Sequence, residues 1–273
     1  MEKVEILMAT YNGENYLSEQ IESIIKQSYR NWALIIHDDG SSDSTLEIVS
    51  SFSKRDDRIT VISDGEVFRS ASKNFEHLAK LSSAKYVCFS DQDDVWREDH
   101  VLNLVEEIES QDIDGRPRLV FSDCTVVDKE LNEMYASLVK FRRTKPRLSR
   151  SLKMMSVRNC VTGCAMILNR AAIEVSIPFH SSANMHDHWI SLCVLKNGGD
   201  VTFLDKITVN YRQHTGNVIG ADGPGVYRKL VSKGEMKKSI RRTWSAYEQA
   251  KEIGAVRNYV QFLVLKMLAK MSY

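Results

Sequence analysis

An apolar run leads directly into a cluster of acids at Tyr86-Val87-Cys88-Phe89-Ser90-Asp91-Gln92-Asp93-Asp94. The first four residues are typical of a buried strand. The carboxylates after it repel one another, and a fold tolerates this when a cation with a phosphorylated ligand binds there. Mg²⁺ and Mn²⁺ suit such oxygens, because they usually take one or two protein carboxylates and complete their shell with phosphates and water. The alternative is that Asp93 or Asp94 caps the next helix; one Asp fits that role well, but three fit it poorly.

The sequence before this segment alternates apolar strands with amphipathic helices. We expect strands at 4–9, 32–36, 59–62 and 86–89, and helices around 17–25, 46–52 and 75–81. This β-α-β order predicts a parallel, doubly wound sheet.

The second half is less regular. We expect strands at 119–121, 164–168, 201–204 and 207–211, the last two separated by a tight turn at Asp205-Lys206. A helix is expected at 186–195, ended by Asn197-Gly198-Gly199. Residues 220–225, rich in glycine, predict a boundary before a helical segment from 226 onward.

Polar clusters follow three of the predicted strands. They are Thr10-Tyr11-Asn12, Asp38-Asp39 and Asp91-Gln92-Asp93. In open α/β sheets, ligands bind outside the carboxyl ends of the strands. The three turns are therefore expected to converge on one ligand-binding edge.

Length and composition indicate a globular α/β protein. A chain of 273 residues with 43% apolar side chains can form one large domain with an appendage. The sequence has no apolar run of about 18 residues and no visible signal peptide, so we expect a cytoplasmic protein. The five cysteines are scattered, and no second close-spaced Cys/His pair joins Cys160 and Cys164 in a zinc site. We expect reduced, mostly buried thiols.

The charge is distributed unevenly. Residues 224–273 carry a net charge of +8 and residues 1–223 carry −7, while residues 140–158 hold eight Lys or Arg and no acid. Such basic segments indicate an anionic surface as partner, although solvated loop and helix faces explain individual side chains equally well. Nucleic acid is not expected, because the predicted ligand edge is acidic and lacks interleaved basic and aromatic residues.

Several motifs in order resemble the family 2 glycosyltransferases, which have the GT-A fold. The matching segments are Met8-Ala9-Thr10-Tyr11-Asn12-Gly13, Ile36-His37-Asp38-Asp39-Gly40-Ser41-Ser42-Asp43, Asp91-Gln92-Asp93-Asp94-Val95-Trp96, Val161-Thr162-Gly163-Cys164-Ala165 and His186-Asp187-His188-Trp189. The resemblance implies a Rossmann-like, mostly parallel sheet flanked by helices, with a helical C-terminal appendage. It further implies a transferase domain at 1–220, with a nucleotide-binding half at 1–97 and an acceptor half at 98–220, and a basic extension at 221–273.

The resemblance also implies nucleotide contacts. Asp39 would accept the N3–H of a uracil or thymine ring, Thr10 and Tyr11 would line base and ribose, and Glu14 would contact ribose. The implied nucleotide-binding set is Thr10, Tyr11, Asn12, Glu14, Asp39, Asn74, Asp91 and Gln92, with Arg69 and Lys73 as further donor contacts. The alternatives are a helix cap near Asp43 for Asp39, packing for Tyr11, and a first-turn helix acid for Glu14.

The metal and the catalytic base follow from the same resemblance. Asp91 and Asp93 match the family's D-x-D motif and would bind Mn²⁺ or Mg²⁺, with His214 or Arg212 adding a ligand or positive charge. Asp187 stands where the family places its base, which removes the acceptor proton during inversion. The alternatives are a first-turn helix acid for Asp187, a structural histidine for His214, and a helix cap for Asp94.

One segment departs from the family pattern. The family often carries Asn-x-Gly after the third strand, where this chain has Ser63-Asp64-Gly65. Donor contacts from this loop therefore do not follow from the resemblance.

The resemblance predicts an inverting, metal-dependent glycosyltransferase. The donor would be a UDP- or dTDP-sugar, and the acceptor a hydroxyl of a glycan or of a lipid-diphosphate-linked glycan in bacterial surface polysaccharide synthesis, as in rhamnosyltransferase-like members. The basic segments would meet the inner face of a membrane, and the apolar C-terminal residues can also support a homodimer. The alternatives are a sugar-1-phosphate nucleotidyltransferase, which needs a glycine- and arginine-rich loop after the first strand, and a non-catalytic nucleotide-binding module.

Overall fold

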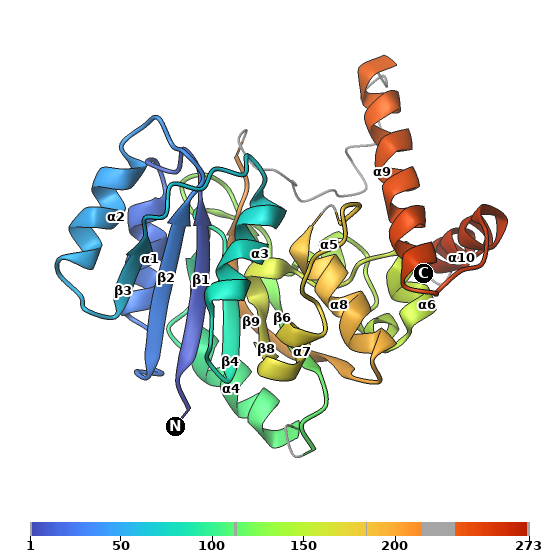
Figure 1. The fold of residues 1–273 in the computed structure, drawn as a ribbon, viewed down its shortest axis with the longest axis horizontal. Helices are drawn as coiled ribbons and strands as arrows, with labels where there is room; N and C mark the ends of the chain where they lie inside the picture. Colours follow the sequence, from blue (N-terminus) through green and yellow to red (C-terminus); the bar gives the residue numbers. More distant parts are fainter. Residues whose placement is uncertain (1, 112–113, 184, 215–232, 272–273) are drawn as a thin grey trace.

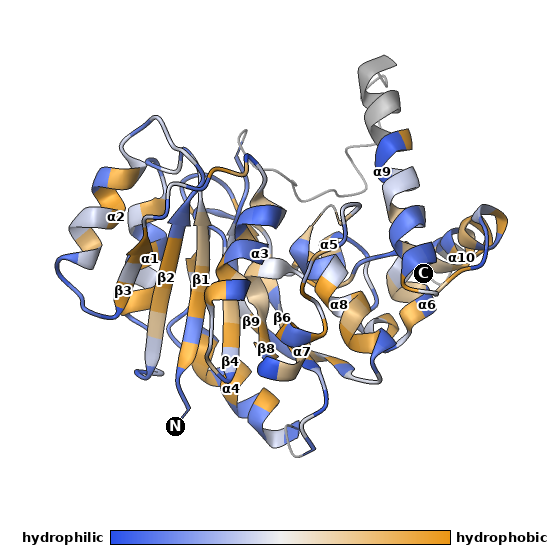
Figure 2. Ribbon diagram, in the orientation of Figure 1, coloured by the Kyte–Doolittle hydropathy of each residue, from blue (hydrophilic) through white to orange (hydrophobic). Residues whose placement is uncertain are grey.

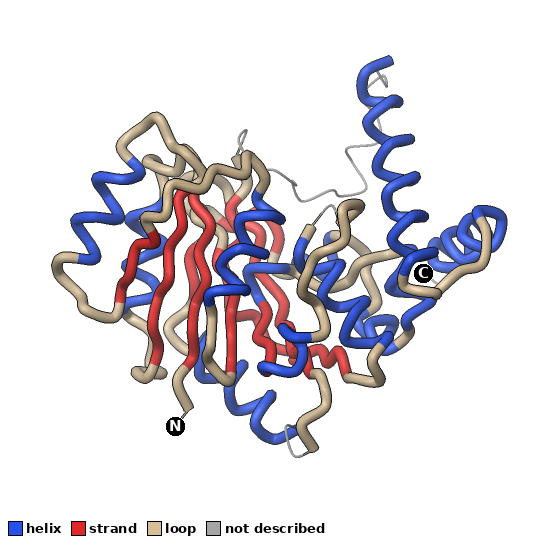
Figure 3. Tube along the Cα trace, in the orientation of Figure 1, coloured by secondary structure: helices blue, strands red, loops and turns tan. Residues whose placement is uncertain are grey.

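A mixed sheet forms the centre of the molecule and helices cover both faces (Figure 1; Figure 3). The computed structural model describes residues 2–111, 114–183, 185–214 and 233–271. Within these ranges the strand order is β3-β2-β1-β4-β8-β6-β9-β5, with β7 paired to β6. The strands are β1 (Val4–Thr10), β2 (Trp32–Asp38), β3 (Ile59–Ile62), β4 (Tyr86–Ser90), β5 (Val95–Trp96), β6 (Arg118–Val127), β7 (Glu133–Tyr135), β8 (Met166–Asn169) and β9 (Asp200–Arg212).

The first four long strands are parallel, as predicted. They alternate with α1 (Leu17–Ile25), α2 (Thr45–Ser53) and α3 (Ala71–Leu81). Thr10 pairs with Asp38, and Met8 pairs with Ser90. The polar turns after β1, β2 and β4 therefore start at nearly the same level, which places them at one edge of the sheet.

The second half of the sheet is mixed. β8 runs antiparallel to both β4 and β6, β9 is parallel to β6, and β5 is antiparallel to β9. The doubly wound parallel arrangement therefore holds for the N-terminal half alone. β9 also returns to the acidic segment, because its pairing with β5 begins directly after Asp94.

The predicted turn at Asp205-Lys206 is wrong. Both residues lie inside the continuous strand β9, where Ser122 pairs with Leu204 and the next residue, Asp123, pairs with Ile207. The extra residues are accommodated as a bulge, which lets a polar pair interrupt an apolar strand without reversing the chain.

Alternate residues of β1 pack on opposite faces of the sheet. Ile6 and Met8 lie with α1 and with α4 (His100–Gln111), whereas Leu7 lies with α3 and with α8 (His186–Lys196). Figure 2 shows the apolar colour concentrated on the strands and the polar colour on the connecting loops. This alternation follows from the period of two along a strand, and it makes the sheet a rigid support for its C-terminal edge.

Residues 138–174 contain short helices, and two longer helices follow toward the C-terminus. The short ones are α5 (Leu138–Phe141), α6 (Leu152–Val157), α7 (Arg170–Glu174) and the 3₁₀ turns Pro146–Arg150 and Gly163–Ala165. α9 (Lys233–Glu252) and α10 (Tyr259–Met271) share a small core of Ala250, Val256 and Phe262, against which Val157 of α6 packs (Figure 1). The boundary expected at 220–225 lies outside the described residues. None of the helices in the described ranges is long and apolar enough to cross a membrane.

Candidate active site

The turns after β1 and β2 are joined by side-chain hydrogen bonds. The Thr10 hydroxyl donates to Asp38 at 2.9 Å, and the other oxygen of Asp38 accepts the backbone N–H groups of Gly40 and Ser41. Thr10 is buried, so its hydroxyl serves to fix the turn. These contacts bring the first two predicted turns together.

Gln92 joins the third turn to the first. Its amide accepts the backbone N–H of Tyr11 at 2.8 Å and donates to the Tyr11 carbonyl at 2.9 Å. A Cβ atom on Gly13 would lie 2.5 Å from the Gln92 side-chain oxygen, so this approach requires glycine. The Tyr11 ring is 54% exposed and offers an accessible flat face at the edge of the sheet.

Asn12 and Glu14 hold the turn between β2 and α2. Asn12 accepts the backbone N–H of Ser42 at 2.8 Å, and Glu14 accepts that of Ser44 at 3.0 Å. Both side chains are predicted nucleotide contacts, and the structure places both at the ligand edge. Their role toward a nucleotide stays a prediction.

Asp39 organises the connection between β3 and α3. The buried carboxylate accepts the backbone N–H groups of Phe68, Arg69 and Ser70, the last two at 2.9 and 2.8 Å. Its oxygens accept from this connection and not from α2, whose N-cap residue is Ser44. The alternative of a cap near Asp43 is therefore wrong, and the proposed role of Asp39 toward a base stays a prediction.

Asn74 points at His37. It is buried on α3, its oxygen lies 2.8 Å from His37 Nδ1, and its nitrogen donates to the His37 carbonyl at 3.1 Å. Lys73 is exposed beside it on α3. Both ends of the Asn74 amide therefore bond to His37 of β2. The predicted contact of Asn74 with a nucleotide stays a prediction.

The acidic segment meets the end of β9. His214 Nε2 lies 2.7 Å from Asp93 Oδ2, and the Tyr16 ring packs against His214 at a tilt, with centroids 4.6 Å apart. Two of the three predicted metal ligands, 121 residues apart in the chain, are therefore in contact.

The third predicted ligand, Asp91, lies close to other acids. Burial, followed by the charges of Asp93 and Asp187, raises the pKa of Asp91 to about 7. A carboxyl group with this pKa is poised to lose its proton to a cation near neutral pH. Two carboxylates and an imidazole suit Mn²⁺ and are compatible with Mg²⁺ in ligand type, whereas the ligand atoms that lie within 4.8 Å of one another at this edge are those of Asp91, Asp94 and Cys164.

Asp94 has a structural position. It is fully buried, and one oxygen accepts the backbone N–H of Arg212 at 3.0 Å. The following helix α4 begins only at His100, so the prediction that Asp94 caps it is wrong. Burial and the charges of Asp93 and Asp91 raise the pKa of Asp94 well above its usual value. Asp94 thus supports the end of β9 through one oxygen, and its carboxylate also lies within 4.8 Å of the ligand atoms of Asp91 and Cys164.

Arg212 fixes the acidic segment from the inside. Its guanidinium donates to the Asp93 carbonyl at 2.8 Å and to the Lys129 carbonyl at 2.6 Å, pairs with Glu19, and lies 4.6 Å from the centre of the Tyr16 ring. Arg212 is 1% exposed. The guanidinium therefore holds the backbone of the acidic turn, a role that the sequence did not reveal.

Asp187 occupies the first turn of α8, as predicted. Asn159 donates to it at 3.0 Å, and the backbone N–H of His188 donates at 2.6 Å. Its charge contributes to the raised pKa of Asp91, which places it beside the acidic cluster. Asn159 was missed by the sequence reasoning, because a lone Asn in a basic loop carries no motif.

His186 precedes Asp187 and is buried among apolar side chains. Its ring packs on Phe75 and Phe89 with centroids 4.2 and 4.9 Å apart, and neither ring nitrogen has a hydrogen-bond partner. A Cβ atom on Gly163 would lie 2.6 Å from His186 Nε2. Burial lowers the pKa of His186 to about 4, against a smaller opposite effect of Asp187. The ring is therefore neutral at physiological pH.

This burial predicts acid sensitivity. Between about pH 6.5 and 4 the unfolded chain protonates His186 and the folded protein does not, so stability falls as pH falls through this window, by up to about 1.4 kcal/mol per pH unit. His186→Phe keeps the ring packing and removes this proton. Chemical denaturation at pH 7, 6, 5 and 4.5 should show a shallower loss in the variant; equal slopes in both proteins would refute this effect.

The family comparison gives the class of the chain. A model of "Glycosyl transferase family 2" matches residues 5–176. The chain belongs to glycosyl transferase family 2. The predicted family and the glycosyltransferase class are thereby confirmed.

Relatives of this family 2 glycosyltransferase carry more specific names. The dTDP-rhamnosyl transferase RfbG of Shigella flexneri is 30% identical over 227 residues, which cover 79% of this chain and 74% of RfbG. The UDP-Glc:alpha-D-GlcNAc-diphosphoundecaprenol beta-1,3-glucosyltransferase WfgD of Escherichia coli is 29% identical over 196 residues, covering 71% and 70% of the two chains.

Solved structures share the fold of this family 2 glycosyltransferase. S. aureus TarS 1-349, in complex with UDP-GlcNAc, aligns with a TM-score of 0.65 at 17% identity over 99% of this chain and 73% of TarS 1-349. The mannosyltransferase PcManGT from Pyrobaculum calidifontis, in complex with GDP-Man and Mn2+, aligns with a TM-score of 0.58 at 14% identity over 98% and 80%. These similarities confirm the predicted GT-A fold.

Proposed function

We propose that the chain transfers a sugar, with inversion, from a UDP- or dTDP-sugar to a hydroxyl group of a glycan or of a lipid-diphosphate-linked glycan. The observation that carries the proposal is the junction of Asp93 with His214, beside Asp91 and Asp187. This contact supports the proposal, because it gathers side chains of the types that bind metal ions, together with a candidate base, at one edge of the sheet.

The donor half follows from the turns after β1, β2 and β4. Gln92 holds the Tyr11 backbone and leaves its ring exposed, and Asp39 orders the segment beside it. An exposed tyrosine face suits stacking on a base. A relative acts with a dTDP-sugar and another with UDP-glucose, which supports a uracil- or thymine-containing donor.

The proposed metal ligands are Asp91, Asp93 and His214. These residues would hold Mn²⁺ or Mg²⁺, which when bound neutralises charge that grows on the leaving nucleoside diphosphate. Arg212 fixes the Asp93 backbone, so that the carboxylate is positioned before the donor binds. Preorganised groups of this kind lower the barrier without reorganising during the reaction.

Asp187 is the proposed base. Its oxygens accept from Asn159 and from the His188 backbone, which fixes the carboxylate at the start of α8. In an inverting transfer the base removes the acceptor hydroxyl proton while that oxygen attacks the anomeric carbon opposite the leaving group. The charge of Asp187 contributes to the raised pKa of Asp91, which supports a common site for the two carboxylates.

A second function is not favoured. A sugar-1-phosphate nucleotidyltransferase needs a glycine- and arginine-rich loop after the first strand, where this chain has Asn12, Gly13 and Glu14 bonded to the β2–α2 turn.

A panel of UDP-, dTDP- and GDP-sugars with Mn²⁺ tests the proposed glycosyltransferase function through protection against thermal unfolding. UDP- or dTDP-sugars should raise the melting temperature in the presence of Mn²⁺; protection by GDP-sugars alone would contradict the donor assignment.

The C-terminal helices suit a contact with an anionic lipid surface, which would place the enzyme beside a lipid-linked acceptor. One stripe of α10 is exposed and apolar; it consists of Val260, Leu263, Val264, Met267 and Leu268. Their spacing of three and four residues puts them on one helix face. The segment from 224 onward carries the net charge of +8. An apolar face with basic residues around it is typical of an interfacial helix.

We expect the double change Val264→Glu and Met267→Glu to reduce sedimentation with anionic phosphatidylglycerol vesicles by roughly tenfold or more. Each change replaces an apolar side chain of the exposed stripe by a charged one, which opposes its burial among the lipids. Leu46→Glu on α2, an equally exposed apolar residue at 48%, serves as the matched control and should sediment like the unmodified protein. Vesicle binding that is unaffected by the double change would refute the contact. A concentration-dependent dimer lost with the same change would assign the stripe to a second copy of the chain.

A further inference from the structure

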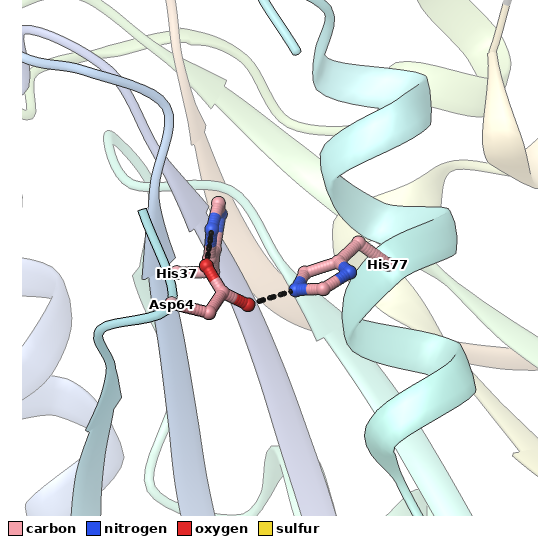
Figure 4. A group of neighbouring side chains, drawn as sticks. All are labelled: His37, Asp64 and His77. Carbon is pink, nitrogen blue, oxygen red and sulfur yellow. Dashed lines mark hydrogen bonds and ion pairs between the residues drawn. The ribbon is translucent and has the colours of Figure 1, made fainter. Parts of the chain in front are cut away.

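Three side chains outside the acidic cluster converge at the other end of the ligand edge. His37 lies near the end of β2, Asp64 lies between β3 and α3, and His77 lies on α3. Figure 4 shows both imidazole rings directed at the Asp64 carboxylate. His37 Nε2 is 3.3 Å from one oxygen and His77 Nε2 is 2.6 Å from the other, and the three ligand atoms all lie within 4.8 Å of one another.

Asn74 fixes which nitrogen of the His37 ring carries a proton. The Asn74 amide nitrogen donates to the His37 carbonyl, so the Asn74 oxygen faces His37 Nδ1, which must carry the proton. Nε2 is the ring nitrogen that faces the Asp64 carboxylate, at 3.3 Å from Oδ1. In the tautomer with the proton on Nδ1, the Nε2 lone pair points to the side on which Asp64 and His77 converge. A metal-bound histidine usually donates its other ring N–H in the way that His37 does here.

The surroundings keep the cluster ordered and leave one side open. His37 is 2% exposed, the Asp64 side chain is 33% exposed, and the Phe68 ring packs against both imidazoles. The backbone N–H of Glu66 donates to Asp64 Oδ1 at 3.1 Å, which fixes the orientation of the carboxylate. The carboxylate is therefore an anionic ligand with access to solvent.

We propose that His37 Nε2, His77 Nε2 and an Asp64 oxygen bind a divalent transition metal ion of the zinc class, with water as the fourth ligand. Zinc binds imidazole nitrogen and carboxylate oxygen at about 2.0–2.2 Å in a tetrahedron, whose ligand atoms lie roughly 3.3–3.5 Å apart. The two observed nitrogen–oxygen separations are 3.3 and 2.6 Å, and all three ligand atoms lie within 4.8 Å of one another, so small side-chain shifts suffice to reach this spacing. Two imidazoles and one carboxylate favour zinc over Mg²⁺, in contrast to the carboxylate-rich site at Asp91 and Asp93.

The ion would connect the structural elements at one end of the ligand edge. It would join β2 and α3 through Asp64, and the same connection supplies the backbone N–H groups of Phe68, Arg69 and Ser70 to Asp39. Fixing this connection would stabilise the position of Asp39. That consequence rests on the proposed function, whereas the metal site does not.

The test is a cobalt titration of the metal-free, full-length protein without a polyhistidine tag. Co²⁺ in a tetrahedral site of nitrogen and oxygen ligands should give visible absorption bands that saturate at one equivalent, without a thiolate band in the near ultraviolet. His77→Gln and Asp64→Asn should each weaken this binding by about tenfold or more. Zn²⁺ should raise the melting temperature of the unmodified protein and have little effect on His77→Gln.

Two controls separate this site from other ligands. Asp93→Asn, which alters the acidic cluster, and His180→Gln, which removes a histidine bonded to Ser182, should both retain the cobalt bands. The proposal is overturned if the unmodified protein gives no visible bands, if His77→Gln binds cobalt equally well, or if Asp93→Asn alone abolishes the bands. Sugar transfer that persists after such an outcome would leave the proposed function intact.

Discussion

Asp187→Asn is expected to lower kcat by about 10²–10⁴-fold, the usual contribution of a positioned general base. The amide keeps the shape of the side chain and cannot accept the acceptor proton. Asn159 and the His188 backbone donate to different oxygens of Asp187, so the amide keeps one of these two hydrogen bonds and loses the other, without a change in side-chain shape. Initial rates of nucleoside diphosphate release with donor and acceptor measure the effect.

The control for this prediction is Glu174→Gln, a charge removal on an exposed part of α7. It should leave kcat unchanged. The KM for the donor should change little in Asp187→Asn, because the base acts in the chemical step. Full activity in Asp187→Asn would show that another group removes the proton.

Asp93→Asn is expected to lower kcat by about 10²–10³-fold and to raise the Mn²⁺ concentration needed for half-maximal rate. The ion supplies several kcal/mol of charge stabilisation, and each 1.4 kcal/mol is a factor of ten. The change also replaces the carboxylate that contacts His214. Rates measured across a Mn²⁺ series test both effects.

Asp57→Asn, on an exposed turn after α2, is the matched control and should titrate with Mn²⁺ like the unmodified protein. Unchanged Mn²⁺ dependence in Asp93→Asn would remove the metal role from this residue. His214→Gln provides an independent check. His214 follows the end of β9 and contacts Asp93, so its replacement should cause the same shift in Mn²⁺ dependence if both residues hold one ion.

The parallel half of the fold could be predicted because its elements carry strong local patterns. Apolar strands end in polar turns, and the register of β1 with β2 and β4 places those turns at one edge. The convergence of Thr10, Asp38 and Gln92 follows from this order alone. The second half could not be read in this way, since β6, β8 and β9 pair across long separations and β9 carries a bulge where the sequence indicates a turn.

The functions of single side chains depend on partners that are distant in sequence. Asp94 resembles a helix cap in sequence, yet it bonds to the Arg212 backbone 118 residues away. Asn74 resembles a donor contact, yet it fixes the tautomer of His37. The His37, Asp64 and His77 cluster has no sequence motif, because its members come from three elements joined only by the fold.

The most direct test of the proposed mechanism is the anomeric configuration of the product, followed by NMR during Mn²⁺-dependent transfer from an identified UDP- or dTDP-sugar. The account predicts transfer that stops on chelation of the metal and a product whose anomeric configuration is opposite to that of the donor. A product with retained configuration, or transfer at full rate in the presence of a chelator, would contradict it.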